Sequence, residues 1–188
     1  MSDARTRILD AALAVFGRHG LRRSTMDLIA TAARMSRPAV YQYFGGKDAV
    51  FQAVGERIVA EVLAAAERTR DDRGLPPADR LCGVLAAKLD AITGGFSAGA
   101  RAEILGEAVE VAPDLVASFK ERHTAILVEV LESVPDLDLE TFPARNVAVL
   151  LSGALNTVAQ EAGEPGDARV LLREHVDLII RGLRRPTT

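Results

Sequence analysis

Apolar side chains recur every three to four residues along the chain, and alternation with a period of two is absent. Near the N-terminus, five apolar positions follow the spacing i, i+3, i+4, i+7 and i+8, which places them on one face of a helix. These positions are Ile8, Ala11, Ala12, Val15 and Phe16. Ala, Leu, Glu and Arg dominate such segments, so helix propensity agrees with the spacing. The pattern predicts an all-α fold of about nine helices.

Caps and breakers divide this pattern into separate helices. The first helix is expected to end at Gly20 in a left-handed conformation, and Thr25 and Ser36 are suitable N-caps for the next two. A short helix from Ser36 is expected to end near Phe44, before the Gly-Gly pair. The later helices are expected at 47–69, 78–92, 100–110, 113–132, 143–161 and 168–184.

The strongest break in the chain is "DDRGLPPAD" at 71–79, which is expected to be a hinge. We predict an N-terminal domain over 2–62, with two adjacent short helices at 25–44, and a C-terminal domain over 63–188. Residues 1–50 hold eight Arg or Lys against four Asp, a net of +4, although the whole chain carries −3. A basic N-terminal segment followed by an acidic remainder suggests that only the N-terminal segment binds a polyanion.

Composition excludes several classes of protein. The single cysteine, Cys82, rules out a disulfide framework and is expected to be a small buried hydrophobe. No signal peptide precedes the first helix, and the longest uncharged run, 146–160, is shorter than the ~20 residues of a membrane-spanning helix. We therefore expect a cytoplasmic protein with no membrane partner. Paired carboxylates, metal-ligand spacing and a nucleophile with a base are missing, so neither an enzyme nor a cofactor is expected.

Two short helices three or four residues apart, preceded by a scaffold helix, suit a helix-turn-helix. Geometry alone is a weak signal, but the residues add much more. The stretch 8–54 contains "ILDAALAVFGRHG", then "TMDLIATAA", then "SRPAVYQYFGGKDAVF". This combination closely resembles the N-terminal domain of the TetR family of bacterial transcriptional regulators. The resemblance covers about a quarter of the chain.

The resemblance implies roles for individual residues. Thr25 would cap the first helix of the motif and meet a phosphate, and Ser36 would cap the recognition helix. Tyr41 and Lys47 would contact phosphates, and Tyr43 would reach the backbone or a base. Arg37 is the leading candidate for reading bases, supported by apolar contacts from Pro38 or Ala39. The DNA-binding set is Thr25, Arg34, Ser36, Arg37, Pro38, Ala39, Tyr41, Tyr43 and Lys47.

Some alternatives stay open at this point. The family usually has glycine where this chain has Arg34, and a left-handed arginine costs about 1 kcal/mol or more. Either the turn is altered or Arg34 is retained for a phosphate contact. Tyr41 and Tyr43 could instead be half-buried core residues, and Arg22 and Arg23 could be solvated charges or phosphate contacts.

The C-terminal segments 146–159 and 168–183 are more apolar than one buried helix face requires. They predict a four-helix dimer interface. The resemblance to the TetR family implies the same, because TetR-like proteins dimerise through such an interface. A single deep core in a monomer is the alternative. The expected interface residues are Val149, Leu150, Gly153, Ala154, Val158, Val176, Ile179 and Leu183.

An effector pocket is expected among the middle helices, on residues that are otherwise plain core. The candidate lining residues are Leu85, Leu89, Phe96, Ile104, Phe119, His123 and Leu127. The scarcity of aromatic residues favours an aliphatic or mixed small molecule. The sequence thus predicts a homodimeric repressor that binds a palindromic double-stranded DNA operator and is released by a small-molecule effector. The alternatives are a helical protein–protein interaction module and an effector-independent regulator.

Overall fold

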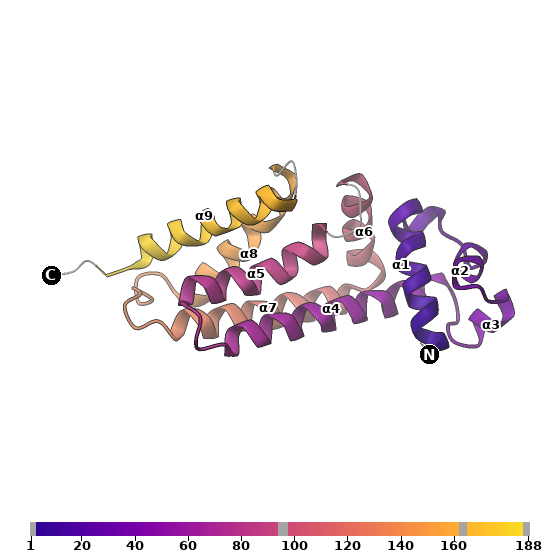
Figure 1. Ribbon diagram of the computed structural model, residues 1–188, viewed down its shortest axis with the longest axis horizontal. Helices are drawn as coiled ribbons and strands as arrows, with labels where there is room; N and C mark the ends of the chain where they lie inside the picture. The colour runs from indigo at the N-terminus through magenta and orange to yellow at the C-terminus, as the bar shows by residue number, and fades with distance from the viewer. Residues whose placement is uncertain (1–2, 94–97, 162–164, 186–188) are drawn as a thin grey trace. The chain divides into compact units, whose positions relative to one another are not determined.

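The computed structural model describes residues 3–93, 98–161 and 165–185. In this part of the chain nine α-helices and no β-strand occur, which confirms the all-α prediction. The helices are α1 (Ala4–Arg23), α2 (Met26–Ala33), α3 (Arg37–Tyr41), α4 (Lys47–Asp71), α5 (Pro77–Thr93), α6 (Ala98–Val111), α7 (Pro113–Glu132), α8 (Ala144–Glu161) and α9 (Pro165–Leu183), as Figure 1 shows. An isolated β-bridge joins Leu137 and Arg184.

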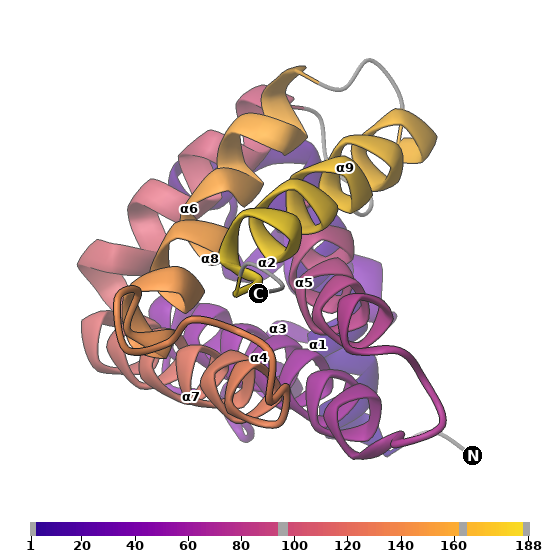
Figure 2. The same ribbon diagram turned by 90° about the vertical axis from the view of Figure 1, so that its left-hand side faces the viewer.

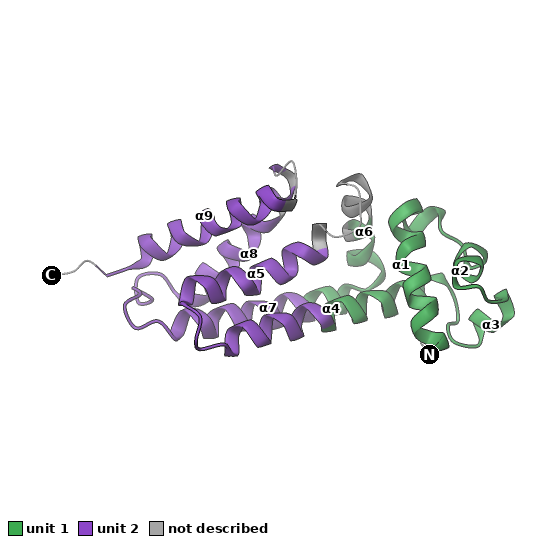
Figure 3. Cartoon of the chain, viewed as in Figure 1, with its two compact units in different colours: residues 1–60, 94–117 green, residues 61–93, 118–188 purple. Residues whose placement is uncertain are grey.

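The chain divides into two compact units (Figure 3). Unit 1 comprises residues 1–60 and 94–117, and unit 2 comprises 61–93 and 118–188. The division therefore lies within α4, whereas the segment 71–79 joins α4 to α5 inside unit 2. The segment 71–79, expected as a hinge, thus connects two helices of unit 2, and the division of the chain lies near the predicted boundary after residue 62.

In unit 1, α1 packs against α2 and α6, and α2 packs against α3 (Figure 1). The apolar stripe predicted for the first helix is buried, with Ile8 and Ala12 fully enclosed. The rings of Phe16 and Phe51 meet edge to face, with centroids 5.4 Å apart. This core fixes α2 and α3 to the scaffold helix.

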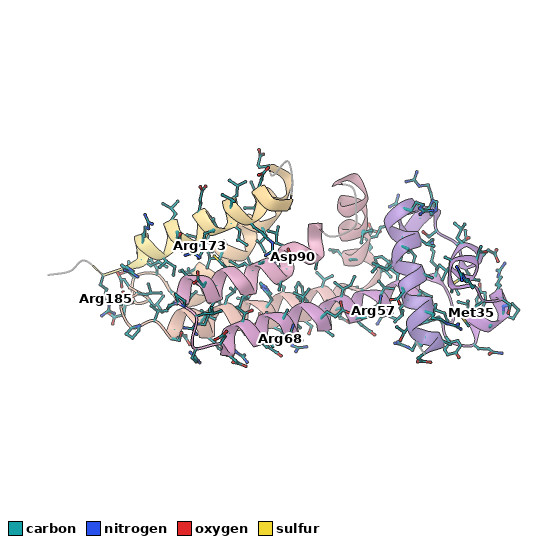
Figure 4. The ribbon with its side chains drawn as sticks, viewed as in Figure 1. Met35, Arg57, Arg68, Asp90, Arg173 and Arg185 are labelled. Atoms are coloured by element: carbon teal, nitrogen blue, oxygen red, sulfur yellow. The ribbon has the colours of Figure 1, made fainter. Side chains whose placement is uncertain are left out.

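In unit 2, α5 packs against α8 and α9, which lie side by side in Figures 1 and 2. Ion pairs between α5 and α9 border this packing: Arg169 lies 2.6 Å from Asp90, and Arg173 contacts Asp79. Asp90 and Arg173 are labelled in Figure 4. The core between the helices is aliphatic, with Leu81, Leu155 and Val176 fully buried.

Candidate nucleic-acid interface

The first helix of the motif, α2, begins at a hydroxyl cap. The Leu28 N–H donates to Thr25 Oγ1 at 3.2 Å, which satisfies one of the free donors at the helix start. Before the cap, Gly20 has φ 71° and ψ 165°. The expected positive φ is therefore present, but ψ is far from the left-handed helical value, and helical residues continue to Arg23 after this kink. The Ser24 hydroxyl donates to the Gly20 carbonyl.

The turn between α2 and α3 keeps a left-handed residue at the position where a glycine is usual. Arg34 has φ 55° and ψ 45°, and its side chain is exposed. Its N–H donates to the Thr31 carbonyl at 3.1 Å, and the next N–H, of Met35, donates to the Ala30 carbonyl at 2.9 Å. The turn is thus not altered; the arginine adopts the conformation that normally favours glycine.

Helix α3 presents most of its side chains to solvent. Ser36 caps it by accepting the Ala39 N–H at 3.3 Å, and Val40 is its fully buried residue. Tyr41 and Tyr43 are 42% and 45% exposed, so they are surface residues and the core alternative does not hold. Arg37 and Pro38 are exposed and Ala39 is half-buried. Two exposed tyrosines, two residues apart on a small domain, suit contact with a partner.

The guanidinium of Arg37 lies between two side chains of the same unit. Its Nη1 donates to Asp27 Oδ2 on α2 at 3.1 Å, and Nη2 lies 3.5 Å from the Tyr41 hydroxyl. The guanidinium also covers the Tyr41 ring, 5.5 Å from its centroid. The hydrogen bond to Tyr41 and the charge of Asp27 raise the pKa of Arg37 above its ordinary value. The residue expected to read bases is therefore positioned in advance.

Lys47, at the start of α4, is bonded within the protein. Its Nζ donates to the Leu21 carbonyl at 2.8 Å and lies 3.4 Å from the Arg22 carbonyl, so the ammonium satisfies acceptors at the end of α1. Arg22 pairs with the buried Glu107 of α6 at 3.3 Å, and Arg23 donates to the His19 carbonyl. All three cations thus have partners inside unit 1.

Sequence reasoning missed the contact between Asp27 and Arg37. Asp27 lies in the first turn of α2, and a pair ten residues apart across a turn has no periodic signal in the sequence. Met35, in that turn, is labelled in Figure 4.

The expected effector residues do not form one group. Leu85, Leu89, His123 and Leu127 are buried in unit 2, and Phe119 is half-buried there. Ile104 instead belongs to unit 1 and packs against its core. Phe96 lies outside the described residues.

The expected dimer residues also divide into two groups. Val158, Val176 and Leu183 are buried inside the subunit itself, because α8 and α9 turn these positions toward α5 and each other. Val149, Leu150 and Gly153 are exposed, and Ala154 and Ile179 are half-buried. Leu150 on α8 and Leu178 on α9 are 67% and 73% exposed, and Val170 and Leu171 on α9 are also exposed.

None of the helices in the described residues is long and apolar enough to cross a bilayer. A capped first helix, a left-handed turn and an exposed second helix on a scaffold helix together define a helix-turn-helix protein. Residues 8–54 match the family model described as bacterial regulatory proteins, tetR family. The N-terminal part of the chain is thus similar to the tetR family of bacterial regulatory proteins, which confirms the resemblance seen in the sequence.

Individual relatives are similar mainly in the N-terminal part. The chain is 34% identical over 68 residues to the HTH-type transcriptional repressor SCO4008 of Streptomyces coelicolor, covering 36% of this chain and 35% of that protein. It is 33% identical over 86 residues to the HTH-type transcriptional regulator BetI of Paraburkholderia phymatum, covering 46% and 44%. The chain thus spans less than half the length of these curated relatives.

Solved structures extend the likeness to the whole fold. A TetR-like transcriptional regulator from Rhodococcus sp. RHA1 is 28% identical, with a TM-score of 0.68 over 95% of this chain and 96% of that one.

Proposed function

We propose that this chain is a homodimeric transcriptional repressor that binds a palindromic operator and leaves it when a small molecule binds. The observation that carries this proposal is the surface of α3 and the turn after it: a capped helix start with Arg37, Pro38 and Tyr41 exposed, followed by the exposed Tyr43. A core function accounts for none of these four side chains. A helix in the major groove, flanked by phosphate contacts, accounts for all of them.

Roles within this surface follow from chemistry. Arg37 is the base-reading residue, since a guanidinium can donate two hydrogen bonds to guanine in the major groove. The tyrosine hydroxyls and the hydroxyl-capped starts of α2 and α3 suit phosphate oxygens. Lys47 contributes charge at the start of α4, with the N–H that its two carbonyl partners leave free.

Dimerisation is supported by apolar surface on unit 2. Val149 and Leu150 on α8, and Val170, Leu171 and Leu178 on α9, are all exposed. An apolar surface of this kind on a soluble protein usually marks an interface. A second copy that pairs α8 and α9 with its own would form the four-helix arrangement. A dimer carries two recognition helices, which suits a palindromic operator with half-sites ~34 Å apart.

The repressor proposal is tested by fluorescence anisotropy with the DNA upstream of the gene. We expect tight binding to a palindromic site and weak binding to a scrambled duplex. Arg37→Ala should cost about 1–3 kcal/mol of discrimination, whereas Lys47→Ala should weaken both duplexes alike and reduce the salt slope by about 1. Equal binding of the two duplexes by the unaltered protein would favour an interaction module, and tight binding that no small molecule relieves would favour an effector-independent regulator.

A further inference from the structure

In unit 2, a lysine, a serine and a histidine come together from three helices. Lys88 on α5 donates from Nζ to Ser152 Oγ on α8 at 2.7 Å. The same ammonium lies 5.9 Å from the centroid of the Phe119 ring on α7. The Phe119 ring in turn lies 5.6 Å from the ring of His123, one turn further along α7.

Among the described residues, no acid compensates the charge of Lys88. The neighbouring charge that acts on it is that of Lys120, another cation, and burial and this repulsion lower the pKa of Lys88. Its hydrogen-bond partner, a serine hydroxyl, is neutral. Buried cations in proteins normally have an anionic partner, and none acts on Lys88 in the described part of the chain.

His123 adds a second unsatisfied group. Its side chain is 1% exposed, and Nε2 lies 3.3 Å from the Val84 carbonyl, so Nε2 carries the hydrogen. Nδ1 is then a bare acceptor, and it is buried without a hydrogen-bond partner among the residues that the structure describes. Most buried polar atoms are hydrogen-bonded, so an orphan beside an uncompensated cation points to a ligand.

The surroundings of these polar groups are apolar. Leu85 and Leu89 are buried on α5 on either side of Lys88, and Leu127 is buried one turn beyond His123 on α7. Few polar groups in an apolar setting are typical of small-molecule sites. One ammonium and one hydroxyl suit a single negative charge, whereas phosphate dianions are usually held by several cations or an arginine fork.

We propose that this cluster binds the effector and that the effector is a small organic carboxylate with an apolar body. Its carboxylate accepts hydrogen bonds from Lys88 Nζ and the Ser152 hydroxyl. The apolar body packs against Phe119 and the leucines, and His123 Nδ1 accepts from a hydroxyl or water at the edge of the site. This assignment rests on the proposed function only in naming the ligand as the effector; the binding site itself does not depend on it.

The test is isothermal titration calorimetry of the full chain with acetate, hexanoate, octanoate and decanoate. Octanamide has the same apolar body as octanoate without the charge, and inorganic phosphate provides an anion without the body. We expect at least one of the longer carboxylates to bind, and its amide to bind at least about tenfold more weakly, because a hydrogen bond to a charged group is lost. This comparison needs no variant, so it remains decisive if a variant fails to fold.

The variants then locate the site. Lys88→Gln should weaken carboxylate binding about tenfold or more, and Ser152→Ala about threefold. Lys120→Gln is the matched control, because it removes the same charge from an exposed lysine on the neighbouring helix and should change binding by less than about threefold.

Several results would overturn the assignment. They are equal affinity for acid and amide, no loss in Lys88→Gln, no binding of any carboxylate in the series, or phosphate binding that depends on Lys88. Operator binding measured on the same samples separates the two proposals. If the carboxylate binds through Lys88 but leaves the operator complex intact, the binding site is confirmed. Its role as the effector site is then wrong. If the unaltered protein does not select the operator, the repressor proposal fails whatever the ligand does.

Discussion

Asp27 and Tyr41 hold the guanidinium of Arg37 before any DNA is present. A side chain that is already positioned loses less rotamer freedom on binding. This favours the complex with DNA in which a base lies where the positioned guanidinium can bind it. The Asp27 carboxylate is also exposed, so it repels phosphates that approach without that fit. Asp27 is therefore expected to contribute to selectivity without touching a base.

We predict that Asp27→Asn lowers the ratio of operator to scrambled-duplex affinity by about three- to tenfold, mainly by strengthening the nonspecific complex. Anisotropy titrations on both duplexes measure this ratio. Asp10→Asn is the control, because it removes an equally exposed acid that pairs with Arg57 in the same unit at 2.6 Å. An unchanged ratio in Asp27→Asn would show that the pair has no role in selectivity.

Arg34 occupies a backbone conformation that costs an L-residue about 1 kcal/mol relative to glycine. Arg34→Gly should therefore raise the free energy of unfolding by about 1 kcal/mol in a denaturant titration. Arg34→Ala keeps the Cβ and removes the rest of an exposed side chain together with its charge, so it should leave stability nearly unchanged. If the alanine variant gains as much as the glycine variant, charge rather than backbone strain is the cause.

Burial, together with the charge of Lys88, lowers the pKa of His123 to about 4 from its ordinary 6.5. Between these two pKa values, His123 is protonated in the unfolded chain and neutral in the folded protein. The free energy of unfolding is therefore unaffected by His123 above about pH 6.5. It decreases as the pH falls toward 4, by up to about 3 kcal/mol. Urea titrations across this range should show the decline, and His123→Gln should flatten it. His175, whose pKa burial also lowers, leaves a smaller decline of the same sign.

At the scale of elements, an ion pair joins α1 and α6: it links the exposed Arg22 to the buried Glu107. Glu107 is buried and neither carboxylate oxygen has a hydrogen-bond partner, so Arg22 is its compensating charge, although Arg22 itself is exposed. Arg22→Ala leaves that carboxylate buried alone and should lower the free energy of unfolding by about 1–3 kcal/mol. The double variant Arg22→Ala with Glu107→Gln should recover most of this loss in thermal unfolding.

Arg23→Ala is the control, because among the described residues the Arg23 side chain donates to a backbone carbonyl four residues earlier and pairs with no acid. Its effect should stay within about 0.5 kcal/mol. A loss in Arg23→Ala as large as in Arg22→Ala would contradict a specific role for the buried acid.

Helix positions could be predicted from the sequence because their signals are local. Pro113 opens α7 and Gly45 precedes α4, as caps and breakers indicated. The short helix was expected to reach Phe44 but ends at Tyr41, since Tyr43 and Phe44 continue as turns bonded to the Val40 carbonyl. Local signals say little about where such a fraying end stops.

Packing partners could not be predicted, because they depend on residues far apart in the chain. The sequence did not indicate that α6 packs on α1, nor that Lys88 meets a serine 64 residues away. A helix that is apolar on most sides also does not reveal which side faces its own core. Val176 and Leu178 illustrate this: both lie in the apolar segment 168–183, yet one is fully buried and the other 73% exposed.

At the scale of the whole molecule, the exposed apolar side chains of α8 and α9 should decide the oligomeric state. Leu178→Glu places a charge at the most exposed of them and should weaken the dimer about 100-fold or more, because an unpaired carboxylate is costly to bury. Sedimentation velocity measures the change. Leu75→Glu, at an exposed leucine in the loop before α5, should leave the dimer intact. A dimer in Leu178→Glu would require another interface.

The three lysines of the chain lie in different surroundings, so the chemical reactivity of each is expected to respond to a different binding event. Lys120 is exposed, Lys47 is bonded to the end of α1, and Lys88 is half-buried beside Ser152. An amine-acylating reagent read by mass spectrometry should therefore label Lys120 first in every state. Protection of Lys47 would follow operator occupancy, and protection of Lys88 would follow ligand occupancy. A single labelling experiment on the unaltered protein can thus follow both equilibria at once, with its own internal reference.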